Sequence, residues 1–492
     1  ALWDGVITML WMRFQAYDTF TRNGEVYFSG NDAWYHLRQV NYTIRNWPST
    51  MPYDPWTGFP YGTLSGQFGT LYDQLVATAA LAVGFGDPSQ ELIARTLLVT
   101  PAIIGSLIAL PTYAIGKRLG GRLGGLFAAV VLMLLPGTFL RRSLVGFADH
   151  NVAEPLFMTV AVLTTMVALT VADRERPVWE LVADRDIDAL RDPLKWSALV
   201  GVTIALYMWV WPPGILLVGI TGVYILIQIV NASVQGDSPE HIAFVAGVAL
   251  PITAAMMAVK IRSPGFAVTG FTLLQVFLPL AVGVGAVFLA WLARWWESRN
   301  LEQTSCPAAV AGLVVASLVL FSLILPGAFG TILSNLLSTV GFSAGATTRT
   351  VGEAQPFLDP GILQRQGLSA SGRIVSEYGF TFFSGLLASI WLAAKPLVKS
   401  GDARKIGYVA GSLGIIALIF LVPAIPDGLG GAVGVESSLV SLAIVATLTL
   451  GAVLQADYEP ELLFILVWVA FITSAAFTQV RFNYYLAPGV AV

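Results

Sequence analysis

A short polar segment between two long apolar stretches holds the residues best suited to chemistry. In RRSLVGFADHNVAE, residues 141–154, an acid, an imidazole and an amide follow one another as Asp149, His150 and Asn151. Ionisable groups at or inside a bilayer cost several kcal/mol, so a cluster of this kind indicates a functional site. A solvated helix end is the structural alternative. Two other acidic loops, around Asp32 and Glu353, favour the functional interpretation, because the predicted topology places all three on one side of a membrane.

The composition defines the class of protein. The 492 residues are 56% hydrophobic and 12% charged, and the mean hydropathy is +0.72. These values predict an all-α, polytopic membrane protein. The single cysteine, Cys306, excludes an internal disulfide framework, and three histidines in the whole chain argue against a poly-His zinc site. The net charge of −3 argues against nucleic acid as a partner.

About thirteen apolar stretches are candidates to cross the bilayer. The stretch 71–85 is rejected as a span and expected at the interface, because it is short and includes Asp73 and Gln74. The first stretch is expected to be the end of a span already under way. The predicted spans are residues 1–14, 92–116, 123–140, 151–172, 195–211, 213–231, 241–260, 268–296, 306–325, 376–395, 404–424, 434–454 and 460–480.

The distribution of basic residues predicts the orientation. With the first span running outward, the short inner loops hold fourteen Lys and Arg residues: Lys117, Arg118, Arg122, Arg174, Arg176, Arg185, Arg191, Lys195, Arg294, Arg299, Lys395, Lys399, Arg404 and Lys405. The short outer segments hold five: Arg141, Arg142, Lys260, Arg262 and Arg481. Because cytoplasmic loops are enriched in Lys and Arg, this difference supports both the orientation and the rejection of 71–85.

This orientation places every polar constellation on the extracellular face of a cell membrane. Two long outer loops are expected, residues 15–91 with Asp32 and residues 327–375 with Glu353. The Asp149 segment, the Trp209–Trp211 turn and Arg481 fall on the same face. The sequence contains neither a P-loop nor a dinucleotide fingerprint. An outward-facing enzyme without ATP needs an activated donor, and in a membrane this suggests a lipid phosphate.

Four motifs carry a resemblance to a known family. In order, GNDAWYHLRQV, SLVGFADHNVAE, TVGEAQP and QVRFNYYLAP resemble the membrane-domain motifs of oligosaccharyltransferase catalytic subunits, with the archaeal single-subunit form the most similar. The resemblance implies a glycosyltransferase of the GT-C fold, with residues 1–492 as its transmembrane domain. It also implies further spans and a soluble acceptor-recognition domain, with a WWDYG motif, beyond this chain. Such enzymes transfer an oligosaccharide from a dolichyl phosphate or pyrophosphate to the asparagine of Asn-X-Ser/Thr.

The resemblance also implies roles for particular residues. The first acidic motif falls on Asp32 and the metal motif on Asp149 and Asn151, with His150 as a replacement ligand for Mn²⁺ or Mg²⁺. The loop glutamate falls on Glu353, and the phosphate-binding arginine falls on Arg481. Asn151 departs from the family pattern, because relatives usually have Asp, Glu or His there. The arginine span is the fourth after the loop glutamate where the second is expected, which implies an inserted helical pair.

The residue types support this chemistry on their own. An amide nitrogen is a poor nucleophile because its lone pair is delocalised, so carboxylates that accept both N–H bonds of the acceptor asparagine, here Asp32 and Glu353, would twist the group and take its proton. A hard divalent ion on Asp32 and Asp149 would polarise the leaving phosphate, with Arg481 as a second cation. The indoles of Trp209 and Trp211 suit contact with a sugar or lipid head group, or an interfacial aromatic belt.

Two alternatives remain from the sequence. A secondary transporter would have its acids near the bilayer midplane on broken helices and often shows internal repeats, and neither feature is found here. Another GT-C transferase, such as a protein O-mannosyltransferase, would share most of the site, and TVGEAQP with its loop glutamate separates the two. The predicted partners are a dolichyl-linked oligosaccharide, secreted or surface acceptor polypeptides and the bilayer.

Overall fold

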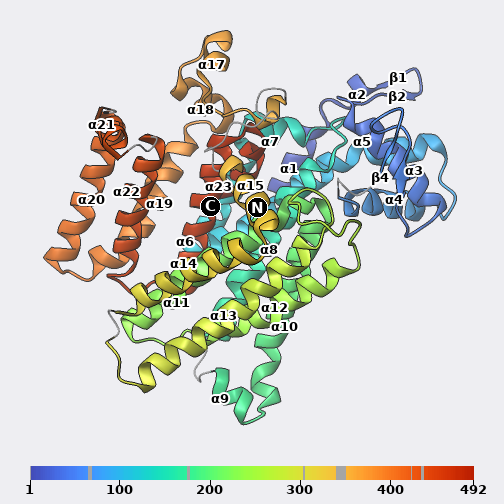
Figure 1. Ribbon diagram of the computed structural model, residues 1–492. Coiled ribbons are helices and arrows are strands. Elements are labelled where there is room, and N and C mark those ends of the chain that lie inside the picture. Colours follow the sequence, from blue (N-terminus) through green and yellow to red (C-terminus); the bar gives the residue numbers. More distant parts are fainter. Residues whose placement is uncertain are drawn as a thin grey trace.

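In the described part of the chain, a helix lies on each predicted span. The computed structural model describes residues 2–64, 69–173, 178–302, 305–339, 351–422, 424–433 and 437–492, and helices dominate it (Figure 1). The helices on the predicted spans are α1 (Leu2–Phe14), α5 (Gln90–Leu107), α6 (Ala109–Leu134), α8 (Ala153–Ala172), α10 (Ile187–Val210), α11 (Ile215–Gln235), α12 (Glu240–Ala258), α13 (Leu274–Ser298), α14 (Cys306–Ile324), α19 (Thr381–Lys399), α20 (Ala403–Leu421), α22 (Ser437–Val453) and α23 (Pro460–Thr478).

The number of spans stays a prediction. In the described ranges, 10 segments have the length and apolar composition needed to cross a membrane. The helices α1, of 13 residues, and α22, of 17, fall short of that length, and 90–134 is counted as a single 45-residue segment. Gly120 and Gly121 leave helical geometry inside α6, Gly121 with φ +68°. This break lies between the predicted spans 92–116 and 123–140.

The outer loop 15–91 contains the two small sheets of the described chain. Its elements are α2 (Tyr17–Phe20), the hairpin of β1 (Thr21–Arg22) with β2 (Glu25–Val26), α3 (Asp32–Arg45), the antiparallel pair β3 (Tyr53–Asp54) with β4 (Thr63–Leu64), and α4 (Leu71–Val83). At 1.5 Å per residue, the 13 residues of α4 span about 20 Å, less than a bilayer core of about 30 Å. The rejection of 71–85 as a span is consistent with this length.

Short elements form the remaining connections. They are α7 (Gly137–Arg142), η1 (His150–Val152), α9 (Val178–Ala183), η2 (Pro212–Gly214), α15 (Pro326–Thr339), η4 (Gly352–Ala354), α17 (Pro360–Gln366), α18 (Ala370–Tyr378), α21 (Ala424–Val433), η5 (Val480–Phe482) and α24 (Asn483–Ala491). Part of the predicted loop 327–375, residues 340–350, lies outside the described residues. In Figure 1, α17, α2 and the first hairpin lie at the top and α9 at the bottom, so the predicted outer and inner connections lie at opposite ends.

A close approach between α10 and α12 organises the centre of the bundle. These two helices contact each other and also α8, and α12 contacts α13. A Cβ on Gly201 of α10 would lie 2.3 Å from the carbonyl oxygen of Ala249 on α12. Thr253 Oγ1 donates a hydrogen bond of 3.0 Å to the Gly201 carbonyl. The absence of a side chain at residue 201 therefore sets how closely the two helices pack.

Gly201→Ala should destabilise the protein by about 1–3 kcal/mol, because the added methyl group must push two packed backbones apart. The matched control is Gly219→Ala on α11, where a Cβ meets nothing within 4 Å, so its effect should be neutral or slightly stabilising. Thermal unfolding of the full-length protein in detergent measures both. Equal melting temperatures for the two variants would contradict the proposed close contact.

Candidate metal centre and outer polar site

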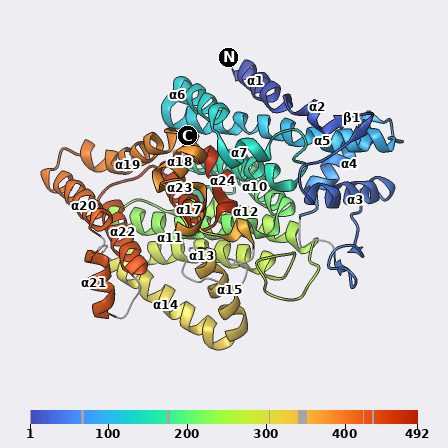
Figure 2. The same cartoon turned by 90° about the horizontal axis from the view of Figure 1, so that it is seen from above.

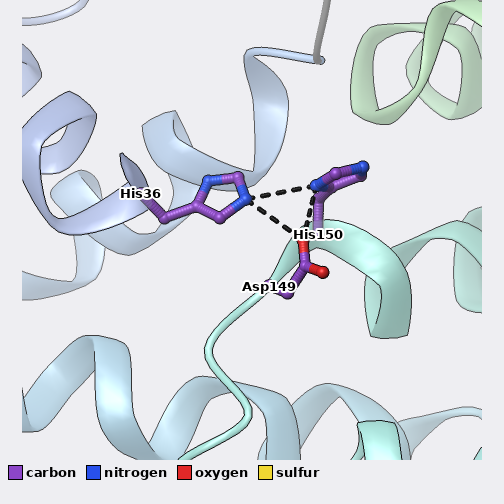
Figure 3. Close-up of side chains that lie close together, drawn as sticks. All are labelled: His36, Asp149 and His150. Carbon is purple, nitrogen blue, oxygen red and sulfur yellow. Dashed lines mark hydrogen bonds and ion pairs between the residues drawn. The ribbon is translucent and has the colours of Figure 1, made fainter. Parts of the chain in front are cut away.

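A compact polar centre at the predicted outer face consists of His36, Asp149 and His150 (Figure 3). His36 comes from α3, whereas Asp149 and His150 come from the turn that leads into α8. His36 Nε2 lies 3.2 Å from Asp149 Oδ1 and 3.1 Å from His150 Nδ1, and His150 Nδ1 lies 2.7 Å from Asp149 Oδ1. All three side chains are buried. Two segments more than a hundred residues apart in sequence therefore meet through three ligand-type atoms.

Each imidazole of this centre has a second carboxylate behind it. The other ring nitrogen of His36, Nδ1, lies 2.7 Å from Asp73 Oδ1 on α4. His150 Nε2 lies 3.2 Å from Glu154 Oε1, one turn further along the chain. A carboxylate on the far nitrogen fixes the tautomer and orientation of a histidine that binds a metal. The arrangement therefore presents Nε2 of His36 and Nδ1 of His150 toward a common point.

The donor set fits a divalent cation. In an octahedral site with metal–ligand bonds of about 2.1 Å, adjacent ligand atoms are about 3.0 Å apart. The three sides of the triangle, 2.7, 3.1 and 3.2 Å, are close to this value. In the described part of the chain, these residues form a His/Asp group whose ligand atoms lie within 4.8 Å of one another. Two imidazoles suit a transition ion better than Mg²⁺, which prefers oxygen ligands.

The charges of the cluster also favour a bound cation. Burial alone would lower the pKa of His36, but Asp73 and Asp149 outweigh burial and raise this pKa to about 10. Burial would raise the pKa of Asp149, but His150 and His36 hold it well below its usual range. The carboxylates of Asp73 and Asp149 thus lie on opposite nitrogens of the His36 ring. The cluster needs positive charge, which a proton on His36 or a metal ion supplies.

The other predicted metal ligands lie beside this triangle. Asp32 is the first residue of α3, and its pKa is raised by burial and by the negative charges of Asp149 and Glu353. Asn151 donates a hydrogen bond from Nδ2 to Asp149 Oδ2, and its Oδ1 lies 2.8 Å from the Tyr484 hydroxyl. The roles of Asp32 and Asn151 as ligands stay predictions. In the structure, Asn151 orients Asp149 from the side.

Glu353 reaches the same region through an ion pair. Its carboxylate pairs with Arg142, a buried residue at the end of α7. The Arg142 guanidinium also lies over the ring of Tyr484, 4.9 Å from its centroid, and its Nε and Nη1 have no hydrogen-bond partner. The acidic loop residue is thus held at the outer face by an arginine from another segment.

The loop around Glu353 is joined to the turn that carries Arg481. Val480 donates a backbone hydrogen bond of 3.0 Å to the Gln355 carbonyl, and Phe357 donates one of 3.0 Å to the Phe477 carbonyl. The ring of Phe357 is buried and packs edge-on against Phe477 at 5.6 Å. The loop glutamate and the arginine therefore belong to one packed unit.

Arg481 and the two tryptophans lie in two different environments. The Arg481 guanidinium lies over the Trp211 ring at 5.4 Å, and its buried Nε has no hydrogen-bond partner. The Trp209 ring lies instead under Lys260 Nζ at 4.6 Å. Burial and Arg262 lower the pKa of Lys260 to about 8. The structure therefore adds Lys260 as a cation beside the predicted donor-side aromatic residues.

Several residues of the site were missed from the sequence. They are His36, Asp73, Arg142, Glu154, Tyr484 and Tyr485. His36 follows Asp32 by four residues, a spacing that places both on one helix face. Asp73 argues against a span at 71–85, but an acid in an apolar helix is also a signal of function. The hydroxyls of Tyr484 and Tyr485 both contact Glu154 Oε2, which no sequence spacing predicts.

Fold and site together define a multi-span helical membrane protein of the GT-C type with a polar centre at one end. The family model "Oligosaccharyl transferase STT3, N-terminal" matches residues 6–492, so the chain belongs to this family. It is 64% identical over 487 residues to the dolichyl-monophosphooligosaccharide–protein glycotransferase AglB of Haloferax volcanii, covering 99% of this chain and 46% of that relative. The chain thus spans about half the length of this relative.

Solved structures support the same fold. The oligosaccharyltransferase AglB of Archaeoglobus fulgidus, in complex with an inhibitory peptide and a dolichol-phosphate, matches with a TM-score of 0.75 at 22% identity, covering 100% of this chain and 48% of that one. A complex of the Archaeoglobus fulgidus oligosaccharyltransferase with Zn and sulfate matches with a TM-score of 0.62 at 20% identity, covering 100% of this chain and 52% of that one. At these identities the similarity shows the fold.

Metal binding can be tested without an activity assay. Asp149→Ala removes the central ligand and should nearly abolish the rise in melting temperature that Mn²⁺ gives the full-length protein, because a ligand stabilises only the state that binds it. Asp73→Asn should weaken Mn²⁺ binding about 10–100-fold by releasing His36. The matched control is Asp87→Asn, an exposed residue of the same outer loop. An unchanged Mn²⁺ effect in Asp149→Ala would exclude this centre.

Asn151→Asp should have two opposite effects. Without metal, a second carboxylate beside Asp149 adds like-charge repulsion and should lower the melting temperature. With metal, the added negative charge should tighten Mn²⁺ binding several-fold. Melting curves of the full-length protein with EDTA and with Mn²⁺ measure both effects. If EDTA and Mn²⁺ change the melting temperature of the variant by the same amounts as that of the wild type, residue 151 is not beside the ion.

Proposed function

We propose that this chain is the membrane part of an oligosaccharyltransferase. It would transfer an oligosaccharide from a dolichyl phosphate or pyrophosphate to the asparagine of Asn-X-Ser/Thr sequons, at the extracellular face of a cell membrane. The observation that carries this proposal is the convergence at one end of the bundle of the His36–Asp149–His150 centre, the Arg142-bound Glu353 and the Arg481 turn. The name of the Haloferax volcanii relative favours a monophosphate donor.

On the acceptor side, two carboxylates would activate the asparagine amide. Asp32 and Glu353 come from the two long outer loops. They lie close enough to each other for the charge of Glu353 to raise the pKa of Asp32. Two such carboxylates can accept the two N–H groups of an asparagine amide and reduce its conjugation. As the nitrogen–carbon bond to the sugar forms, one amide proton passes to a carboxylate. Arg142 holds Glu353 in place for this role through their ion pair.

On the donor side, the bond between the sugar carbon and the phosphate oxygen breaks, and the lipid phosphate leaves with its electron pair. His36, Asp149 and His150 would hold the divalent cation, with Asp32 and Asn151 beside it. When bound, this cation supplies Lewis-acid stabilisation of the negative charge on the leaving phosphate. Arg481, held over Trp211, supplies a second positive charge. Lys260 over Trp209 offers a further cation for the donor head group.

The position of the site supports an enzyme over a transporter. A transporter places its binding groups near the bilayer midplane on discontinuous helices. Here Asp149 and His150 precede α8, and Arg142 ends α7, so the polar groups lie where helices begin and end. A protein O-mannosyltransferase would need no amide-activating acid, and Glu353, drawn into the site by Arg142, favours an asparagine acceptor.

Glu353→Gln and Arg481→Ala should produce different defects. The first keeps the size of the side chain but removes its charge, so turnover of a sequon peptide should fall by about two orders of magnitude or more while donor affinity survives. The second should weaken donor binding, because an arginine–phosphate contact already forms in the ground state. Peptide turnover and donor affinity are measured separately in the full-length enzyme with Mn²⁺.

Matched controls are Glu91→Gln and Arg365→Ala. Glu91 is an exposed acid paired with Arg95 at the start of α5, and Arg365 is an exposed residue of α17. Neither change should alter turnover or donor affinity. Near-normal turnover of Glu353→Gln would remove the acceptor assignment, and unchanged donor affinity in Arg481→Ala would remove the donor assignment.

A further inference from the structure

The short helix α7 supports the residue that pairs with Glu353. It is 6 residues long, and Arg142 at its end binds the Glu353 carboxylate through their ion pair. The start of α7 has no cap of its own, because the residue before it is Pro136, whose side chain makes no capping hydrogen bond. The first N–H groups of a helix need acceptors from outside the helix. The position of Arg142 therefore depends on what holds the start of α7.

Glu377 of α18, which contacts α7, supplies the missing cap (Figure 1). Its Oε1 accepts a hydrogen bond of 2.7 Å from the backbone N–H of Thr138, and its Oε2 accepts one of 3.1 Å from the Thr138 hydroxyl. The two segments also fit closely, because Gly137 has φ +78° and a Cβ there would collide with the backbone carbonyl oxygen of Glu377. A carboxylate 239 residues away in sequence thus caps α7 where the local chain does not.

Two carboxylates of one segment therefore hold the same helix. Glu353 and Glu377 lie near the two ends of residues 351–378, and their partners on α7 are Arg142 and Thr138. Residues at positions i and i+4 lie on one face of a helix, about 6 Å apart along its axis. The segment 351–378 thus attaches to α7 at two points that are about one helical turn apart.

Side chains inside the segment connect its two ends. The Arg373 guanidinium on α18 lies over the Phe357 ring, 5.0 Å from its centroid. Tyr378, which follows Glu377, is buried, and its ring meets the Phe357 ring edge-on with centroids 6.1 Å apart. A displacement of Glu377 would therefore be transmitted to Phe357, which lies only one turn η4 and a few residues beyond Glu353.

We propose that Glu377 is a positioning residue for Glu353. By capping α7, it holds Arg142 where the guanidinium binds the Glu353 carboxylate, and it fixes the far end of the same segment. Glu377 acts through α7 and does not itself contact the acceptor. This role rests on the function proposed above for Glu353, and it extends the acceptor side of the site to a residue behind it.

Glu377→Ala removes both hydrogen bonds to Thr138 and should lower sequon-peptide turnover by the full-length enzyme about 10–100-fold, because a displacement of about 1 Å at a reacting group can cost that much. Donor affinity should not change. Glu377→Gln keeps an acceptor oxygen for the Thr138 N–H and should retain most of the turnover. The matched control is Asp359→Ala, which removes a carboxylate cap of α17 in the same segment and should turn over as the wild type does.

A double-mutant cycle separates positioning from a general effect on stability. If Glu377 acts through Glu353, Glu377→Ala should change turnover little in a Glu353→Gln background, because the two losses are coupled. Equal losses in both backgrounds would overturn the positioning role. Equal losses in Glu377→Ala and Asp359→Ala would overturn it as well, since any lost cap in the segment would then suffice.

Hydrogen exchange tests the same role without turnover. In Glu377→Ala, the Phe357 amide, which donates to the Phe477 carbonyl, should exchange faster, whereas α8 and α10 should keep their protection. Unchanged exchange at Phe357, or lost protection throughout the bundle, would overturn the positioning role. Near-normal turnover of Glu353→Gln together with faster exchange in Glu377→Ala would instead remove the acceptor function of Glu353 and leave its segment positioned by Glu377.

Discussion

The structure of this end of the bundle depends on the mutual pairing of buried ionisable groups. His36, Asp149 and His150 are all buried, and none could remain charged there without a partner of opposite charge or a metal ion. Asp73 behind His36, and Glu154 behind His150, complete the pairing. Because these residues come from α3, α4 and the start of α8, the loop 15–91 must dock on the bundle for any of them to be stable. The site and the docking of this loop are therefore formed together.

Distant parts of the chain contribute to the site through short turns at helix ends. The turn η5 with Arg481 leads into α24, which packs against α6, α7 and α8 near the middle of the bundle (Figure 2). From α24, Tyr484 contacts Asn151, and its ring supports Arg142. Helix α24 thus connects the candidate metal centre to the residue that pairs with Glu353. Such support keeps reacting groups in position without requiring them to be on the same loop.

The sequence predicted the helical membrane fold because long apolar runs have one stable solution in a bilayer. It also drew attention to the segments around Asp32, Asp149 and Glu353, because acids between apolar segments are costly. The sequence did not predict His36, Asp73 or Arg142 as site residues. Their importance arises from contacts across 37 to 211 residues, His36 with Asp73 and Arg142 with Glu353. Neither periodicity nor local spacing encodes such contacts.

The two backbone hydrogen bonds that join the Glu353 loop to the Arg481 turn affect how relatives could be recombined. A chimera that exchanges only residues 351–378 would place a loop of different sequence against Phe477 and Val480, whose backbone groups now bond to Phe357 and Gln355. Phe357 would then face a foreign partner in place of Phe477, against which its ring now packs. The smallest exchangeable module of this membrane domain therefore consists of two discontinuous segments, the loop and residues 477–482. A graft designed from the sequence alone would divide that module.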